Sequence, residues 1–267
     1  MPELAATASA AEAEKESMPT MGFLDHLEEL RKRIVYSFVA VMLGSVACWG
    51  FRERIYGIMQ RPIMDALKAN GLSERLVYLN PTEPFNLYLK IAALAGLFLT
   101  SPFVLYQVWM FISPGLYRHE KRYVMPFMIS TISLFTLGGY FGYKVAYPRA
   151  LDFLIDFGKQ FQPMITIGEY THLFLSIVIG MGLIFEMPII VFFLAFMGIV
   201  TPGFMLRHFR YAVLVIFILA AIVTPTPDIF NMCVFASPML GLYALSVGVA
   251  WLVHPNRRKA RKEKQAQ

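Results

Sequence analysis

The sequence predicts an all-α integral membrane protein with six transmembrane helices in one bundle. Of the 267 residues, 57% are hydrophobic and 16% are charged, whereas soluble domains carry about 25% charged residues. Several apolar runs exceed the roughly 18 residues that a bilayer-spanning helix requires. The polar connections between these runs are too short to form a separate soluble domain. Contact with lipid, and not a large soluble core, therefore explains the apolar composition.

The predicted membrane domain covers residues 22–253. The stretch 1–21 is rich in Ala and Glu, predicts a disordered tail, and lacks the apolar core of a cleavable signal peptide. Residues 23–33 place apolar side chains at helical spacing and charged ones between them. This pattern predicts an amphipathic helix along the membrane surface, before a first span over 34–51. The first span would then act as its own insertion signal.

Residues 52–84 predict a small cap outside the membrane. Apolar residues recur at helical spacing over 55–67, and Asn70-Gly71 is expected to end that helix. Residues 76–79 have an extended pattern.

The remaining apolar runs predict the other five spans. Pro102 is expected to kink or tilt the second span, and Pro148 to end the third before a short surface helix over 151–162. The fifth run has only 13 residues, which is short for a full crossing and leaves a re-entrant segment as an alternative. The predicted spans are 85–112, 123–147, 170–199, 211–223 and 229–253.

The charge distribution predicts the orientation. If the fifth run crosses the membrane, both termini lie on the same side, and most of the 24 lysines and arginines lie on that side with them. The positive-inside rule then places both termini in the cytoplasm. Basic runs beside membrane spans set topology and contact anionic lipid, as expected for the basic tail 254–267. No nucleic-acid partner is expected.

Several kinds of chemistry lack a sequence signal. There is no phosphate-binding G-x-x-x-x-G-K-[ST], no H-E-x-x-H and no G-x-S-x-G motif, and the five histidines are scattered. Cys48 and Cys233 lie far apart in apolar segments, which is typical of small buried hydrophobes and not of a disulfide or metal site. The sequence predicts no enzyme, no cofactor and no metal, and an intramembrane protease has no support.

Two carboxylates are expected near the cytoplasmic rim. Glu29 lies on the amphipathic helix, where an exposed pair with Arg33 at i+4 is the simpler interpretation. Glu120 lies between Arg118 and Arg122, so a solvated mixed-charge loop is its simpler interpretation. A Pro-Gly turn after the second span, however, is expected to bring Glu120 to the same rim as Glu29.

Glu186 lies inside an apolar run. A charged group near the bilayer centre costs about 2.5–3.5 kcal/mol and usually faces a bundle interior or a water-filled cavity. Glu186 either makes an interhelical hydrogen bond that holds the bundle or marks a polar site in a concave membrane surface. A solute transporter with Glu186 as proton relay is an alternative, but residues 23–125 and 126–253 show no convincing repeat. A passive scaffold would leave the rim carboxylates unexplained.

Several motifs in order resemble the TatC family, the core membrane subunit of the twin-arginine protein translocase. The resemblance covers residues 22–253. The matching motifs are HLEELRKR at 26–33, SP at 101–102 with LYQVW at 105–109, PGLY at 114–117, EKR at 120–122, FEMP at 185–188, TP at 224–225 and PD at 227–228.

The resemblance implies a concave bundle with short fifth and sixth helices. It implies a receptor and core subunit in the bacterial inner membrane that binds Arg-Arg signal peptides of folded precursor proteins at the cytoplasmic face. The apolar part of the signal would enter a groove lined by the second and fourth spans. The proton-motive force would drive export. Partners would be TatA-type and TatB-type single-span subunits, together with further copies of this chain.

The resemblance also assigns residues. An arginine guanidinium can bind a carboxylate through two parallel N–H···O bonds, which lysine cannot reproduce. Two carboxylates on one rim can therefore recognise two adjacent arginines. The family implies signal-peptide binding by Glu29, Glu120, Phe111 and Arg31, a polar site inside the concave face at Glu186, and matched periplasmic positions at Pro62 and Asp228.

Overall fold

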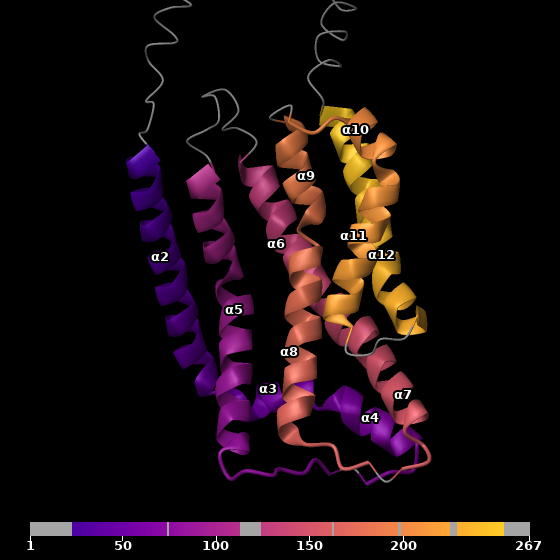
Figure 1. Ribbon diagram of the computed structural model, residues 1–267. Helices are drawn as coiled ribbons and strands as arrows, with labels where there is room; N and C mark the ends of the chain where they lie inside the picture. Colours follow the sequence, from indigo (N-terminus) through magenta and orange to yellow (C-terminus); the bar gives the residue numbers. More distant parts are fainter. Residues whose placement is uncertain are drawn as a thin grey trace, which may run out of the picture.

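The computed structural model describes residues 23–73, 75–112, 124–161, 163–196, 199–224 and 229–253. Over these ranges the protein is helical, and its β-structure is a single isolated bridge. Most helices stand side by side, while α3 (Arg52–Met59) and α4 (Arg61–Ala69) lie across one end of the bundle (Figure 1). The predicted tails, 1–21 and 254–267, lie outside the described residues.

The chain crosses the bundle six times in alternating directions, as the sequence predicts. The first described residues of α2 and the last of α12 lie at the same end (Figure 1). The fourth crossing is made of two helices, α8 and α9. The crossings are α2 (Phe23–Trp49), α5 (Glu83–Ile112), α6 (Val124–Phe141), α8 (Ile167–Ile184) with α9 (Met187–Phe196), α11 (Phe209–Val223) and α12 (Ile229–Val253).

The last two helices differ in length. α11 has 15 residues, about 22 Å at 1.5 Å per residue, which is less than the roughly 30 Å of a hydrocarbon core. The short fifth helix is therefore confirmed. α12 has 25 residues, so the short sixth helix implied by the family resemblance is wrong in residue count. Pro238 lies inside α12 without ending it, because losing one amide donor does not outweigh the apolar run on either side.

The first span begins earlier than the sequence predicts. α2 is one continuous helix from Phe23 to Trp49, so residues 23–33 do not form a separate helix on the membrane surface. The stretch 23–43 contains neither Pro nor Gly. An ion pair between Lys32 and Glu28 at 2.9 Å also supports the helical turn that leads into the apolar part.

The cap consists of two helices where the sequence predicts one. α3 (Arg52–Met59) and α4 (Arg61–Ala69) meet at Gln60. Pro62 lies in the first turn of α4 and has no N–H to continue the hydrogen bonds of α3. The chain then turns at Gly71, whose φ of 67° favours glycine.

The extended segment after the cap is confirmed. Val77 pairs with Thr166 in the isolated bridge. Its N–H donates to the carbonyl of Ile165 at 3.0 Å, and its carbonyl accepts from Ile167 at 2.8 Å. This bridge fixes the first turn of α8 against the cap.

The third span does not end at Pro148. A π-helical turn, η3 (Gly142–Ala146), follows α6 and leads directly into α7 (Tyr147–Phe157). Pro148 lies in the first turn of α7, where a missing N–H is tolerated. The predicted surface helix is thus a continuation of the third span. α7 packs against α4 and α8 at the cap end.

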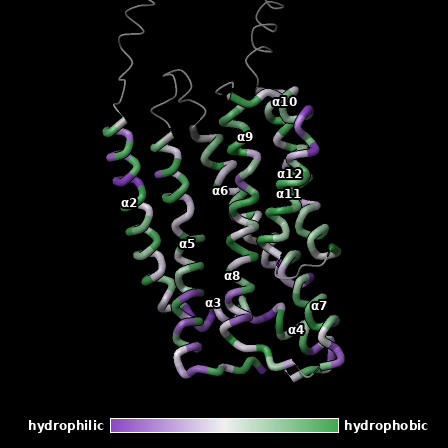
Figure 2. Tube along the Cα trace, viewed as in Figure 1, coloured by the Kyte–Doolittle hydropathy of each residue, from purple (hydrophilic) through white to green (hydrophobic). Residues whose placement is uncertain are grey.

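The main core lies where α5, η3, α7, α8, α11 and α12 meet the cap. Hydrophobic side chains continue along the crossing helices, whereas hydrophilic residues gather in the cap and in the upper part of α2 (Figure 2). The side chains with almost no exposed surface include Ile63, Tyr147, Tyr170, Ile177, Met181 and Phe235.

Candidate functional site: a polar rim and a break in the fourth span

The rim site is formed by the first turns of α2 and the last turns of α5. These two helices pack along each other, and their rim ends lie at the same end of the bundle as the described termini (Figure 1). The His26 ring stacks on the Phe111 ring, with centroids 4.3 Å apart and an interplanar angle of 18°. The stack places the predicted residue Phe111 on the same rim as Glu29, which lies one turn after His26.

Hydrogen bonds through Arg33 connect Glu29 on α2 to the buried side chain of Gln107 on α5. Oε1 of Glu29 accepts from Nη2 of Arg33 at 3.1 Å, and Nη1 of Arg33 donates to Oε1 of Gln107 at 2.9 Å. The Glu29 and Arg33 side chains are 17% and 22% exposed, and Gln107 is 5% exposed. The pair at i+4 that the sequence allowed is therefore present, but it is largely buried and anchored to a second helix.

The second carboxylate oxygen of Glu29 has no partner in the part of the chain that the structure describes. Oε2 is buried and makes no hydrogen bond with any described residue, and the same holds for Nε of Arg33. Buried polar atoms normally have a partner, because an unmet one costs free energy. By contrast, Arg31 on the same helix is exposed. The rim therefore holds a carboxylate with one oxygen bound by a cation and a second, buried oxygen that makes no hydrogen bond with the described residues.

Sequence reasoning missed Gln107 and the contact role of His26. Gln107 is a polar residue within the apolar run of the second span, and polar residues at membrane depth usually have a function. The sequence could therefore have identified Gln107 as a candidate. It could not have identified Arg33 as the partner of Gln107, because that hydrogen bond depends on how α2 and α5 are aligned along each other.

Glu186 occupies the break between α8 and α9. Its N–H donates to the carbonyl of Leu183 at 3.1 Å, and its own carbonyl accepts from Ile189 and Ile190. The side chain is half-buried, and its Oε1 is buried without a partner among the residues that the structure describes. Glu186 lies within an apolar stretch long enough to cross a membrane, Ile167–Ala195.

The other predicted positions are separated from the rim or lie outside the described ranges. Glu120 and Asp228 belong to the second group. Pro62 lies in the cap, at the opposite end of the bundle from Glu29 (Figure 1). The described residues contain no cluster of three or more His, Cys, Asp or Glu that could hold a metal.

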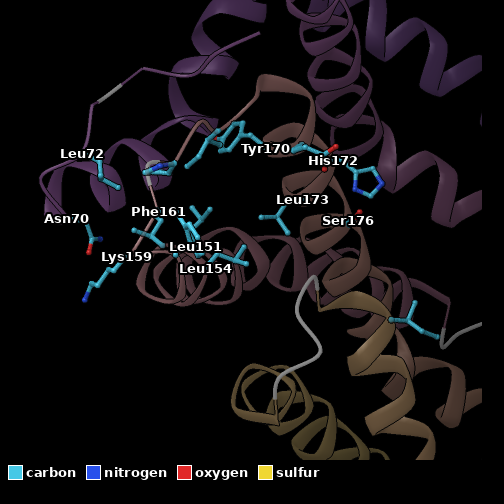
Figure 3. Close-up of a pocket in the computed structure, with 16 residues that line it drawn as sticks. Asn70, Leu72, Leu151, Leu154, Lys159, Phe161, Tyr170, His172, Leu173 and Ser176 are labelled. Atoms are coloured by element: carbon cyan, nitrogen blue, oxygen red, sulfur yellow. The ribbon is translucent and has the colours of Figure 1, made fainter. Parts of the chain in front are cut away.

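A cavity of about 870 Å³ lies at the cap end, not at the rim. Leu151 and Leu154 of α7 line one side, and His172, Leu173 and Ser176 of α8 line another (Figure 3). The cavity does not include any residue of the predicted site.

The fold and these polar positions define a multi-pass helical membrane protein with polar groups at one rim and at a break inside the bundle. A family model described as "Sec-independent protein translocase protein (TatC)" matches residues 25–238. The chain therefore belongs to the TatC family. It is a subunit of the twin-arginine translocase, a transport protein and not an enzyme, and acts with other Tat components.

Relatives and solved structures agree with this assignment. A Sec-independent protein translocase protein TatC from Koribacter versatilis is 63% identical over 96% of this chain and 95% of its own length. One from Carboxydothermus hydrogenoformans is 37% identical over 88% of this chain and 95% of its length. A crystal structure described as a twin-arginine translocase receptor, TatC, has a TM-score of 0.74 and 34% identity over 85% of this chain and 99% of that one. These findings decide against the solute-transporter alternative.

Proposed function

We propose that this chain is the signal-peptide receptor and core subunit of a twin-arginine translocase. It binds Arg-Arg signal peptides of folded precursor proteins at the rim and organises their export, driven by the proton-motive force. It lies in the bacterial inner membrane with both termini in the cytoplasm. TatA-type and TatB-type single-span subunits and further copies of this chain are its partners.

One observation carries the proposal: Oε2 of Glu29 makes no hydrogen bond with any residue that the structure describes. Arg33 already neutralises part of the carboxylate charge through Oε1, and Gln107 holds Arg33 in place. The carboxylate is therefore preoriented, so binding a guanidinium costs little further conformational entropy of the Glu29 side chain. Charge-assisted hydrogen bonds of this type contribute about 1.5–3 kcal/mol. Partial burial strengthens the bond, because less water competes for the oxygen.

The rest of the site is assigned by the family resemblance and stays a proposal. Glu120 would bind the second arginine, while the Phe111–His26 stack forms an aromatic wall and Arg31 contributes an exposed polar contact. Glu186 would act as the polar site inside the groove between α5 and α8–α9 that receives the apolar part of the signal. Pro62 and Asp228 would shape the periplasmic side.

A binding measurement with a matched control tests this proposal. We expect Glu29→Gln to weaken binding of a fluorescent Arg-Arg signal peptide by about tenfold, the equivalent of roughly 1.4 kcal/mol. Glutamine keeps an oxygen for Arg33 but loses the charge that a second guanidinium needs. Glu28→Gln is the control, because Glu28 is 64% exposed and pairs with Lys32 one turn away.

The choice of peptide makes the test specific. The unchanged protein should bind the Arg-Arg peptide more tightly than a Lys-Lys peptide, and Glu29→Gln should remove most of that difference. Equal binding of the Arg-Arg peptide by the unchanged protein, Glu28→Gln and Glu29→Gln would contradict the assignment of Glu29.

A further inference from the structure

A basic and aromatic corner joins α10 (Pro202–Arg207) to α11. This α10–α11 corner comprises residues 204–211, FMLRHFRY, at the end of the bundle that also holds the rim (Figure 1). Arg207 and Arg210 are exposed there, and His208 is half-buried. The segment 199–224 contains no Asp or Glu. The corner therefore carries a positive charge that its own segment does not neutralise.

Contacts with neighbouring helices hold the backbone of the corner in place. Met205 is 5% exposed and packs with Ala195 and Ala250. The carbonyl of Met205 accepts from the Tyr243 hydroxyl at 3.0 Å, and the ring centroids of Phe209 and Tyr243 are 6.0 Å apart. The side chains that face outward from the corner are thus carried by a backbone anchored to α12.

Ring contacts connect the two helices across the corner. The centroid of the His208 ring lies 4.2 Å from that of Phe204 and 6.0 Å from that of Tyr211. The Arg210 guanidinium lies 4.8 Å from the centre of the Tyr211 ring, and its Nη2 donates to the Tyr211 hydroxyl at 3.0 Å. These contacts orient Arg210 without neutralising its charge, because neither the ring nor the hydroxyl is an anion.

Both arginines keep donors for a further ligand. A guanidinium has five N–H donors, and the Tyr211 hydroxyl accepts from one nitrogen of Arg210. Neither Arg207 nor Arg210 forms an ion pair with another described residue. By contrast, Arg33 at the rim pairs with Glu29. The corner is thus suited to a ligand that brings negative charge and oxygen acceptors.

The apolar side chains of the corner indicate which kind of anion fits. The apolar run 211–223 begins at this corner, and aromatic rings beside such a run lie at the headgroup level of a bilayer. A soluble anion would leave the apolar side chains in water, whereas a phospholipid would cover them with its acyl chain and bring its phosphate to the arginines. The exposed large side chains of the corner are Phe204, Leu206, Phe209 and Tyr211.

We propose that the α10–α11 corner binds the headgroup of an anionic phospholipid, with Arg207 and Arg210 on the phosphate. Anionic lipids attract basic segments next to membrane spans, and arginine can bind a phosphate through two parallel hydrogen bonds. No carboxylate of the segment competes for the two cations. Lipid binding here requires neither a signal peptide nor a particular orientation of the chain. A negative result is therefore distinguishable from failure of the receptor assignment.

Native mass spectrometry of the full chain is the direct test. The detergent-purified protein is mixed with phosphatidylglycerol or with phosphatidylcholine of the same acyl chains. We expect phosphatidylglycerol to be retained more strongly, and the double variant Arg207→Gln, Arg210→Gln to weaken its retention about tenfold, since two surface cations are removed. Arg207→Lys, Arg210→Lys keeps both charges and should keep most of the retention, although it loses the bidentate geometry.

Arg54→Gln, Arg61→Gln is the matched control, because it removes two exposed arginines from the cap at the other end of the bundle. An equal loss of phosphatidylglycerol in this variant would overturn the site, since net charge alone would then decide retention. Equal retention of the two lipids by the unchanged protein would overturn the choice of an anionic lipid. Equal retention of phosphatidylglycerol by the unchanged protein and by Arg207→Gln, Arg210→Gln would overturn the lipid assignment and favour an acidic protein segment as the ligand.

Thermal unfolding in lipid nanodiscs gives a second readout. A ligand that binds the folded state raises Tm. We therefore expect nanodiscs that contain phosphatidylglycerol to raise Tm relative to phosphatidylcholine nanodiscs, and to raise it less in Arg207→Gln, Arg210→Gln. The same rise in both proteins would overturn the role of the two arginines. A rise of the same size from inorganic phosphate in phosphatidylcholine nanodiscs would overturn the lipid assignment in favour of a free anion.

Discussion

At the scale of the residue, the cap shows how one missing donor is compensated by a distant side chain. In an uninterrupted helix the carbonyl of Ile58 would accept from residue 62, but Pro62 has no N–H. The hydroxyl of Tyr143 donates to the Ile58 carbonyl instead, at 2.8 Å. The next carbonyl, that of Met59, accepts from the buried hydroxyl of Tyr170 at 2.6 Å. Pro62 therefore ends α3, and two tyrosines complete that end.

This compensation predicts a coupling between Tyr143 and Pro62. We expect Tyr143→Phe to destabilise the protein by about 0.5–1.5 kcal/mol, because the Ile58 carbonyl loses its donor. In a Pro62→Ala background the alanine N–H can take over, so the same substitution should cost less. Thermal unfolding of the four purified variants in detergent gives the coupling as a double-mutant cycle. An equal loss in both backgrounds would show that the bond to Ile58 does not replace the missing donor.

The rim shows which part of a site a sequence can reveal. Glu29 was predicted as a candidate, and its pairing with Arg33 follows from spacing alone. The sequence could not predict that, among the described residues, Arg33 bonds one carboxylate oxygen and the other stays without a partner. That outcome depends on Gln107, which holds the guanidinium of Arg33 against α5. Local spacing decides whether a pair can form, whereas packing between helices decides how completely it is satisfied.

At the scale of the element, apolar run length predicted the spans well and their ends less well. The second and last spans, 85–112 and 229–253, agree closely with α5 and α12. Two of the errors occur where a polar or proline residue was expected to end a helix and did not. Arg33 and Pro148 are both inside continuous helical paths. Charged residues reduce apolarity without breaking backbone hydrogen bonds, and proline is tolerated in a first turn.

The close packing of α2 on α5 depends on two glycines, one in each helix. A Cβ on Gly96 would overlap the backbone nitrogen of Ser45, and one on Gly44 would lie 2.6 Å from Cγ2 of Thr100. Neither helix can approach the other this closely with a larger residue. Because Arg33 on α2 must reach Gln107 on α5, the rim geometry depends on this crossing.

We therefore expect Gly96→Ala to push α2 away from α5, lower the thermal midpoint by several degrees and weaken binding of the Arg-Arg peptide. Gly248→Ala is the control, because a Cβ there would meet nothing within 4 Å. Alanine at position 248 should leave the stability unchanged or raise it slightly, since alanine has a higher helix propensity than glycine. Unchanged stability and unchanged peptide binding in Gly96→Ala would contradict this prediction, because they would show that α2 and α5 can accommodate a methyl group at position 96.

At the scale of the whole molecule, the polar groups are divided between two ends and one intermediate level. The rim carries Glu29 and Arg33, the cap carries α3 and α4, and the break in the fourth span carries Glu186. The short α11 adds asymmetry, because about 22 Å of helix cannot match a hydrocarbon core of about 30 Å. Hydrophobic mismatch of this kind is relieved by thinning of the bilayer or by neighbouring subunits. Partner contacts at this side of the bundle would relieve it.

The orientation of the whole molecule gives the last prediction. Asn70 is an exposed residue at the end of α4 in the cap. Gly203 lies in α10 (Pro202–Arg207) at the opposite end of the bundle (Figure 1), and a Cβ there meets nothing within 4 Å. Single cysteines at these two positions, in a Cys48→Ala, Cys233→Ala background, should therefore report the two faces. We expect a membrane-impermeant maleimide added to intact cells to label Asn70→Cys. The same reagent should label Gly203→Cys only after the cells are permeabilised. Labelling of Gly203→Cys in intact cells with protection of Asn70→Cys would reverse the orientation. It would place Glu29 on the outer face, where a signal peptide still in the cytoplasm cannot reach it.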